Sequence, residues 1–167
     1  IQDTEDLNTN IRKILNENKN IDILINNAGN IFTSMFHLTS EKNFKDLFQV
    51  NFFSIVTITQ MVTKLMIRKK SGSVINISSI SAEDGNDARS AYSSSKAALQ
   101  SKSKVLSREL GRFNIRVNCI APGLIDTKML KKNTKPGIIE DIKNRISLAR
   151  LGKSDEVANV ALFLASD

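Results

Sequence analysis

The sequence is poor in cysteine and in the larger aromatic residues, since its 167 residues include one cysteine, one tyrosine and no tryptophan. The single cysteine, Cys119, cannot form an internal disulfide, and its apolar surroundings predict a buried, unreactive thiol. One tyrosine and no tryptophan provide little aromatic surface on which the bases of single-stranded nucleic acid can stack. We therefore expect neither disulfide bonds nor nucleic-acid binding.

Long apolar runs and metal-ligand clusters are also missing. No apolar run approaches the roughly 18–20 residues that cross a bilayer, and the first residues lack the order of a signal peptide. The only histidine, His37, has no cysteine or carboxylate at ligand spacing, so we expect it on the surface or in a loop and predict no metal site. These absences favour a cytoplasmic protein that is not bound to a membrane.

The rest of the composition is typical of one globular domain over residues 1–167, with 41% apolar and 25% charged residues. The net charge of +7 is spread along the chain, with a local cluster at residues 68–70. Basic residues distributed in this way usually lie on the solvated surface. The functional alternative is contact with an acidic protein or an acyl-phosphate compound.

Helical and strand patterns alternate along the sequence. Apolar residues three and four apart predict helices over about 4–18, 40–70 and 91–113, and a last helix that begins near Ser154, which can cap it. Short β-branched runs predict strands at 21–25, 73–78 and 115–121. This alternation predicts an α/β fold with a parallel sheet covered on both faces. The carboxyl ends of the strands then meet at one edge, where ligands of such sheets bind.

Tyr92 and Lys96 stand four apart at the start of a predicted helix, which places both side chains on one face. An ammonium close to a phenol favours the phenolate, and a tyrosine tuned in this way can donate a proton to a carbonyl oxygen while hydride reaches the carbon. Taken alone, such a pair is more often an exposed ring and a lysine on a helix surface. Its meaning depends on the motifs around it.

Five motifs occur together, in the order Asn26-Asn27-Ala28-Gly29, Asn51, Ser79, Tyr92-Ser93-Ser94-Ser95-Lys96 and Pro122-Gly123. With these residues at these separations, nearly the whole chain resembles the classical short-chain dehydrogenase/reductase family. The resemblance implies a Rossmann-like, doubly wound parallel sheet and an oxidoreductase that uses NADP or NAD on CH-OH and C=O groups.

The resemblance implies catalytic roles for four residues, which are Asn51, Ser79, Tyr92 and Lys96. Tyr92 would be the proton donor, Ser79 would hydrogen-bond the substrate carbonyl, and Asn51 would hold a water that links Lys96 to solvent. Ser78 and Ser81 are neighbouring alternatives to Ser79. For Asn51 the alternative is a satisfied amide at a local distortion of the helix.

A second set of residues is implied to contact the cofactor. It comprises Asn26, Ala28, Gly29, Tyr92, Lys96, Pro122, Gly123, Ile125 and Thr127. The small Ala28-Gly29 pair permits close backbone approach, and the segment after Pro122 would meet the nicotinamide carboxamide and the diphosphate. A simple tight turn and an ordinary loop start are the alternatives for these two segments.

Glycine is missing where a nicotinamide-binding fold begins. Such folds open with a strand, a Gly-rich turn and a helix, but the first glycine here is Gly29. The resemblance therefore implies that residues 1–167 correspond to the C-terminal two-thirds of the family fold, without its first βαβ unit and its last strand. The residue that discriminates NAD from NADP would lie in that first unit.

Within the family, the nearest resemblance is to 3-oxoacyl-(acyl carrier protein) reductases of fatty-acid synthesis, on residues 75–79, 85–86, 150–152 and 156–158. It implies homodimers or homotetramers paired through the long helices, and an acidic carrier protein that Lys70 and its basic neighbours could meet. Residues 88–91, Ala-Arg-Ser-Ala, depart from the Gly-Gln-Ala-Asn-like run that those reductases carry. A reductase of a sugar or another small carbonyl or alcohol substrate is thus a close alternative, and a non-catalytic assembly module is a third.

Overall fold

A three-stranded parallel sheet forms the centre of the molecule in the computed structural model, which describes residues 4–18, 20–134 and 136–166. The strands β1 (Ile23–Asn26), β2 (Gly72–Ile77) and β3 (Ile115–Ile120) lie in the order β1-β2-β3. In the register, Ile23 pairs with Ser73, and Gly72 pairs with Ile115. The predicted parallel sheet is confirmed, with strand boundaries within two residues of those expected.

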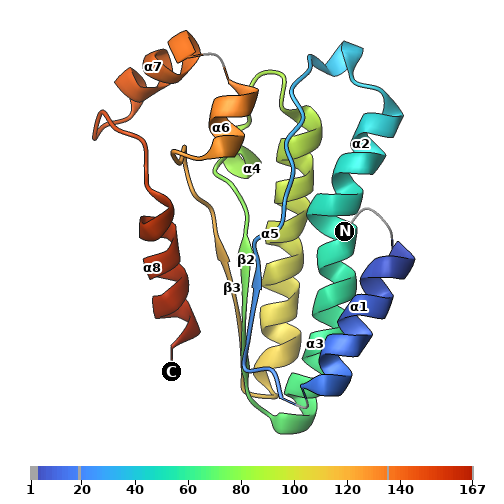
Figure 1. Cartoon of the computed structure of the whole chain (residues 1–167). Helices are drawn as coiled ribbons and strands as arrows, with labels where there is room; N and C mark the ends of the chain where they lie inside the picture. Colours follow the sequence, from blue (N-terminus) through green and yellow to red (C-terminus); the bar gives the residue numbers. More distant parts are fainter. Residues whose placement is uncertain (1–3, 19, 135, 167) are drawn as a thin grey trace.

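Helices cover both faces of this sheet (Figure 1). They are α1 (Thr4–Glu17), the 3-10 helix η1 (Phe36–Leu38), α2 (Glu41–Phe48), the π-helical segment η2 (Gln49–Phe53), α3 (Ser54–Lys69), α4 (Ser81–Asp84), α5 (Ser90–Gly111), α6 (Lys128–Asn133), α7 (Pro136–Arg145) and α8 (Ser154–Ala165). Helices α3 and α5 pack on one face and α8 on the other, while α1 packs against α3. The doubly wound arrangement is the one that the alternating pattern predicts.

Helix α8 is anchored to the sheet by its carboxyl end. The guanidinium of Arg116 donates to the carbonyl oxygens of Leu164 at 2.6 Å and Ser166 at 2.8 Å, and Ser73 Oγ donates to Leu164 O at 3.1 Å. Cations and hydroxyls at this end satisfy carbonyls that have no partner within the helix. The other end corrects an expectation, because Lys153 and not Ser154 occupies the N-cap, with its backbone N–H donating to the Glu156 carboxylate at 2.7 Å.

The predicted helix over residues 40–70 is a continuous run of α2, η2 and α3. Ser40 caps it by accepting from the Asn43 backbone N–H, and Lys70 ends it in the left-handed conformation at φ 56°. We expected no apolar run of bilayer length, but Glu41–Lys69 reaches that length and composition, with mean hydropathy 1.4 in its most apolar window. Packing explains this apolarity, since the helix lies against α1, α5 and β1.

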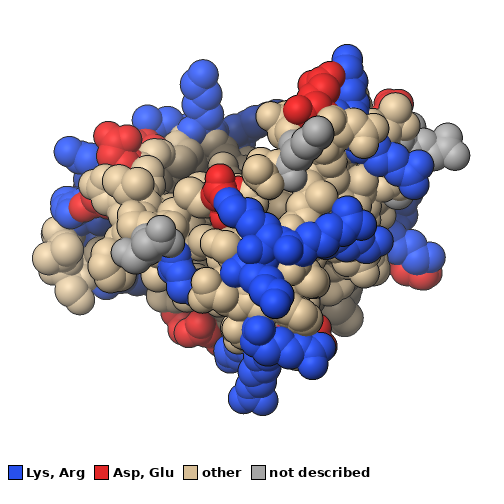
Figure 2. Space-filling model, turned by 90° about the horizontal axis from the view of Figure 1, so that it is seen from below, with Lys and Arg blue, Asp and Glu red and all other residues tan. Residues whose placement is uncertain are grey.

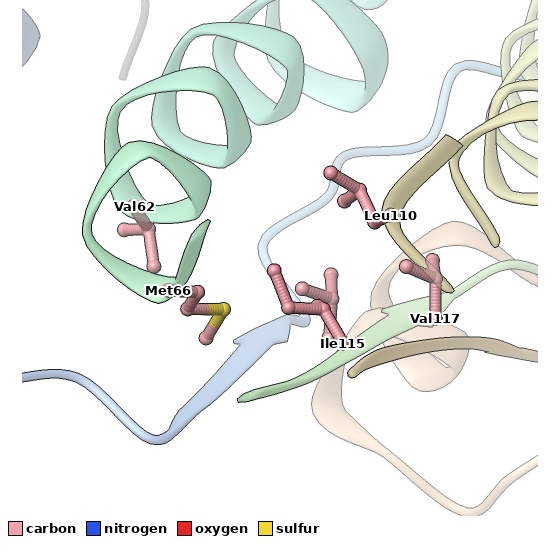
Figure 3. Close-up of a cluster of buried hydrophobic side chains, with 6 residues drawn as sticks. Val62, Met66, Leu110, Ile115 and Val117 are labelled. Atoms are coloured by element: carbon pink, nitrogen blue, oxygen red, sulfur yellow. The ribbon is translucent and has the colours of Figure 1, made fainter. Parts of the chain in front are cut away.

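The main core cluster lies between α3, α5 and the strands (Figure 3). Its buried members are Val62, Met66, Val74, Leu110, Ile115 and Val117. Met66 and Val74 are completely inaccessible to solvent. Because these side chains come from four elements distant in sequence, burying them fixes the position of both long helices on the sheet.

Gly72, at the start of β2, has no room for a side chain. An added Cβ would lie 2.6 Å from Met66 Sδ and 2.8 Å from its Cγ. We expect Gly72→Ala to lower the free energy of unfolding by about 1–3 kcal/mol, because the buried Met66 has to be displaced. Urea denaturation measures this change. Gly111→Ala is the control, since a Cβ there meets no atom within 4 Å; equal stability of the two variants would contradict the prediction.

Candidate active site

The polypeptide continues beyond β2 and β3 with the two segments side by side. Ser78 N donates to Ile120 O at 2.7 Å, and Ile80 N donates to Pro122 O at 3.0 Å. Ser79 therefore lies next to the Pro122-Gly123 turn, at the carboxyl edge of the sheet. This confirms the expectation that the strand ends share one edge.

Lys96 and Tyr92 lie one turn apart near the start of α5. Lys96 Nζ is 6.0 Å from the centroid of the Tyr92 ring and donates to Ile77 O at 2.8 Å. This hydrogen bond fixes the ammonium at the last residue of β2. Lys96 is only 4% exposed, and burial lowers its pKa to about 8, against a smaller opposing effect of the Cys119 sulfur.

Asn51 lies in the π-helical segment η2 and is completely buried. Its Nδ2 donates to Asn30 O at 2.9 Å and to Ser95 Oγ at 3.0 Å, while its Oδ1 accepts from Asn30 N at 2.7 Å. Both amide hydrogens are thus used, and one lone pair of Oδ1 remains for the water that the resemblance implies. Single π-helical turns inside α-helices are frequent at functional sites.

Gly29 brings Asn51 and Lys96 together. A Cβ on Gly29 would lie 3.3 Å from Lys96 Nζ and 3.5 Å from Asn51 Oδ1. The backbone after β1 therefore packs directly on both functional groups. The small residue predicted here is needed, but the close approach that it permits is to Lys96 and Asn51.

The three serines after β2 have different environments. Ser78 is 4% exposed and its hydroxyl donates to Lys96 O at 3.1 Å, so it ties β2 to α5. Ser79 is half-buried and its Oγ accepts from Ser81 N at 3.2 Å. Ser81 is occupied by a hydrogen bond with Asn86. Among the described residues Ser79 thus keeps its hydroxyl hydrogen for another acceptor.

The side-chain amide of Asn26, at the end of β1, takes part in a buried polar network. Its amide is 5% exposed and donates to Asn76 Oδ1 at 2.8 Å and to Thr59 Oγ1 at 3.1 Å, and Asn76 in turn donates to Ser103 Oγ at 2.9 Å. This buried polar network joins β1 and β2 to the two long helices. This network uses the amide hydrogens of the Asn26 side chain within the protein.

The remaining residues of the predicted cofactor set lie on the two turns that border the edge. Ala28 is exposed after β1, and Gly123 follows β3. Ile125 forms a parallel bridge with Gly152, so its backbone is partly used within the protein. Thr127 is the N-cap of α6, where its Oγ accepts from Leu130 N at 3.2 Å, and its hydroxyl hydrogen remains for a ligand.

Two contributors to the site were not predicted from the sequence. Ser95, completely buried, accepts from Asn51 and donates to Tyr92 O at 2.7 Å, which couples Asn51 to the turn that carries Tyr92. The backbone of Asn30 is held on both sides by the Asn51 amide. Ser95 lies inside the Tyr-x-x-x-Lys spacing, but only the fold shows that it faces Asn51.

His37 and Cys119 have different environments. His37 is exposed in η1, as expected. Cys119 is half-buried and burial raises the pKa of its thiol, which agrees with an unreactive cysteine. Within residues 4–18, 20–134 and 136–166, no group of three or more His, Cys, Asp or Glu side chains could hold a metal ion.

Known proteins are similar to this chain in sequence and in fold. A family model described as enoyl-(acyl carrier protein) reductase matches residues 1–167. The 3-oxoacyl-(acyl-carrier-protein) reductase FabG of Chlamydia muridarum is 40% identical over 161 residues, which are 94% of this chain and 63% of that protein. The reductase of the same name from Thermotoga maritima is 36% identical over 167 residues, which are 100% of this chain and 68% of that protein.

A solved structure agrees closely with the fold. The gluconate 5-dehydrogenase of Burkholderia cenocepacia, in complex with NADP and tartrate, superposes with a TM-score of 0.92 at 26% identity. The alignment covers 99% of this chain and 65% of that one. The chain therefore spans about two-thirds of the length of the proteins that it matches.

Proposed function

The chain belongs to the short-chain dehydrogenase/reductase family, and from this membership we propose that the protein catalyses NAD(P)-dependent reduction of a carbonyl group, or the reverse oxidation of an alcohol. One observation carries the proposal. The buried ammonium of Lys96 is held between Ile77 O, Gly29 and the Tyr92 ring, beside the Asn51 amide. A purely structural protein has no need for a desolvated cation at the carboxyl edge of the sheet, whereas a site that transfers a proton needs one.

Groups suited to binding a nicotinamide cofactor lie at the carboxyl edge of the sheet. A Cβ added to Gly123 would meet no atom within 4 Å, so the backbone after β3 borders open space beside Ser79. We propose that the turns at Ala28-Gly29 and at 122–125, the Thr127 hydroxyl, Tyr92 and Lys96 hold the cofactor there. When bound, NADPH or NADH supplies the hydride.

In the proposed reaction, the Oη–H bond of Tyr92 breaks and its proton goes to the carbonyl oxygen as the carbonyl carbon accepts hydride. The Lys96 ammonium places a positive charge beside the tyrosinate that remains, which then takes a proton from solvent. Ser79 donates a hydrogen bond to the carbonyl oxygen. Asn51 positions the Asn30 backbone and Ser95, and through Ser95 the turn that carries Tyr92.

We propose 3-oxoacyl thioesters of fatty-acid synthesis as the first substrate class, supported by the names of the two relatives. The position of Lys70 changes the expected carrier-protein contact. Residues 68–70 end α3 beside the start of β2, at the end of the molecule that Figure 2 views and where basic side chains gather. The site lies at the other end of β2, about 20 Å away.

An acidic carrier protein is better placed at α6. This helix lies at the carboxyl end of the sheet (Figure 1) and exposes Lys128, Lys131 and Lys132. Lys131 forms an ion pair with Asp126 at 2.8 Å, which partly neutralises its charge. Lys128 and Lys132 are therefore the stronger candidates for contact with an acidic partner. We therefore propose α6, and not the cluster at residues 68–70, for any contact with a carrier protein.

Small oxo or hydroxy compounds are the second candidate class. One fold neighbour is a gluconate 5-dehydrogenase that was solved with NADP and tartrate. Residues 88–91, directly before Tyr92, also lack the Gly-Gln-Ala-Asn-like run that the resemblance to acyl-carrier reductases implies. Small substrates do not need the carrier-protein surface.

Self-association through the long helices is also part of the proposal, as is a cytoplasmic location. Phe48, Phe52 and Phe53 form edge-to-face and tilted contacts at the end of α2 and in η2, yet Phe53 remains 51% exposed. Val105 on α5 is also 51% exposed. Apolar exposure on these helices is expected where two copies pair.

A substrate panel tests the proposed function. The complete protein is mixed with NADPH or NADH and with carrier-linked 3-oxoacyl compounds or small sugars and oxo acids, and absorbance of the reduced cofactor is followed. We expect turnover with one class, with kcat/KM at least tenfold above the other. If no carbonyl compound is reduced with either cofactor, the reductase proposal fails and a non-catalytic assembly role is favoured.

A further inference from the structure

Arg89 is a charged side chain close in sequence to Tyr92, and within the described part of the chain it has no carboxylate partner. It precedes α5 and lies three residues before Tyr92. The side chain is half-buried, and its Nη1 atom is buried without a hydrogen-bond acceptor among the described residues. A buried guanidinium nitrogen without a partner costs free energy, since it has lost its hydration without replacement.

The acidic residues closest in sequence do not neutralise Arg89. Glu83 accepts from Gln100, and none of the ion pairs found within the described part of the chain includes Arg89. Asp84 and Asp87 are exposed. Burial lowers the pKa of Arg89, and the charge of an ionised Tyr92 has a smaller effect in the opposite direction. An arginine nevertheless remains charged at neutral pH.

The same turn contains further donors without partners. Ser90 Oγ and Ser93 Oγ are also buried and unpartnered among the described residues. Arg89 and Ser93 are four apart, so they lie on the same side of the helix as each other, with Tyr92 adjacent. The cation and the two hydroxyls thus have hydrogens without acceptors among the described residues, and an oxyanion accepts several hydrogen bonds of this kind.

The backbone before Arg89 is held in an uncommon conformation. Ala88 has φ 60°, a left-handed value that is unfavourable for a residue with a Cβ. Its carbonyl accepts from Ser34 N at 2.9 Å, and Arg89 N donates to Asn86 O at 3.1 Å. These bonds fix the direction in which the chain enters α5. The backbone that leads into Arg89 is therefore held in one conformation, and a residue that binds a ligand specifically needs such a fixed position.

We infer that Arg89 is a specificity-determining residue that binds an anionic group, a carboxylate or a phosphate, on the substrate reduced beside Tyr92. This inference rests on the proposed reductase function and favours its second candidate class, small oxo or hydroxy compounds that carry an oxyanion, over 3-oxoacyl thioesters, which have no oxyanion beside the reacting carbonyl. The substrate then brings the counter-ion that Arg89 lacks among the described residues. A neutral substrate leaves the guanidinium uncompensated.

Binding of tartrate tests the anion site without catalysis. Isothermal titration calorimetry compares tartrate with threitol, its uncharged four-carbon counterpart, on the complete protein at fixed ionic strength. We expect tartrate to bind at least tenfold more tightly than threitol, Arg89→Gln to remove this preference, and Arg89→Lys to keep part of it. Arg108→Gln, at an exposed position near the other end of α5, is the matched control and should bind tartrate as the wild type does.

Kinetics with a 3-oxo acid and its methyl ester tests specificity, and phosphorylated and unphosphorylated hydroxyketones separate the two anion types. We expect the wild type to prefer an anionic form by at least tenfold in kcat/KM. Arg89→Gln should lose this preference mainly through KM, with kcat on the neutral ester within threefold. The inference is overturned if the wild type shows no preference for either anion, or if Arg89→Gln keeps it.

The two assays separate this inference from the proposed function. If neutral esters are reduced and Arg89→Gln changes nothing, the reductase proposal stands and the anion site is rejected. If tartrate binding depends on Arg89 but no carbonyl compound is reduced, the anion site stands and the reductase proposal fails. The wild-type preference is measured without any variant, so a misfolded Arg89→Gln protein still leaves the inference open to contradiction.

Discussion

Replacing Tyr92 with phenylalanine is expected to lower kcat about a thousandfold while cofactor binding stays within threefold of the wild-type value, since a positioned proton donor contributes on the order of 10²–10⁴ in rate. The change removes one oxygen atom and keeps the ring. Tyr92 makes no side-chain hydrogen bond with another described residue, and its ring contact with Lys96 Nζ at 6.0 Å is retained by phenylalanine. The fold should therefore remain intact.

The measurement separates chemistry from binding. Turnover is followed by loss of NAD(P)H absorbance in the complete protein, and cofactor affinity by the change in NAD(P)H fluorescence on binding. Ser94→Ala is the matched control, because Ser94 is an exposed hydroxyl on the same turn of α5. It should keep the wild-type kcat. Unchanged turnover in Tyr92→Phe would show that another group donates the proton, and the proposed mechanism would have to be abandoned.

Lys96→Met is expected to have two effects of opposite sign. Activity should fall about a thousandfold, because the positive charge beside the tyrosinate is lost. Stability at pH 7 should rise, because Lys96 is 4% exposed and its pKa is lowered by burial from 10.5 to about 8. A shift of this size corresponds to roughly 3 kcal/mol against the charged form. Loss of the bond to Ile77 O offsets about 1 kcal/mol of that gain.

The difference in stability between Lys96→Met and the wild type depends on pH. Below pH 8, Lys96 is charged in both the folded and the unfolded protein, so the full desolvation cost acts on the wild type. Between pH 8 and pH 10.5 the folded protein releases the proton while the unfolded chain retains it, so the wild type gains stability as pH rises. The advantage of Lys96→Met should therefore be largest below pH 8 and should vanish above pH 10.5.

Urea denaturation of both proteins from pH 6 to pH 11 measures this dependence. Lys104→Met is the control, since Lys104 is exposed on the same helix and should show no comparable pH-dependent gain. A Lys96→Met protein that is less stable than the wild type at pH 7 would mean that the ammonium is better solvated than its burial indicates. Retained activity in that variant would separate Lys96 from the proposed proton transfer.

The secondary structure could be predicted well because its signals are local. β-Branched runs gave all three strands, and apolar spacing gave both long helices. The errors lie where local signals are weak. In α8, Val157, Val160, Ala161 and Leu164 have the apolar spacing of a buried stripe, but Val160 is 46% exposed and only Ala161 is buried. Spacing along one helix does not say how wide a face its neighbours cover.

The candidate site was only partly accessible to the same reasoning. Tyr92 and Lys96 are joined by helical spacing, and Gly29 and Asn51 by the motif order, so their association could be expected. Asn26 shows the limit, because its amide turns into a network with Thr59, Asn76 and Ser103. Whether an asparagine at a strand end faces the edge or the interior depends on the polar groups packed behind it, which come from elements more than thirty residues away.

The sequence by itself determined the alternation of helices and strands, the edge at which the strand ends meet and the pairing of Tyr92 with Lys96, because hydrophobic period and helical spacing are local properties. Only the tertiary structure decided that Lys96 is desolvated and hydrogen-bonded to Ile77 O, and that Asn51 lies in a π-helical segment and binds the Asn30 backbone. It also decided that Arg89 Nη1 is buried without a partner among the residues that the structure describes. Burial, hydrogen bonding and charge compensation depend on which distant segments surround a side chain, and the fold alone specifies those segments.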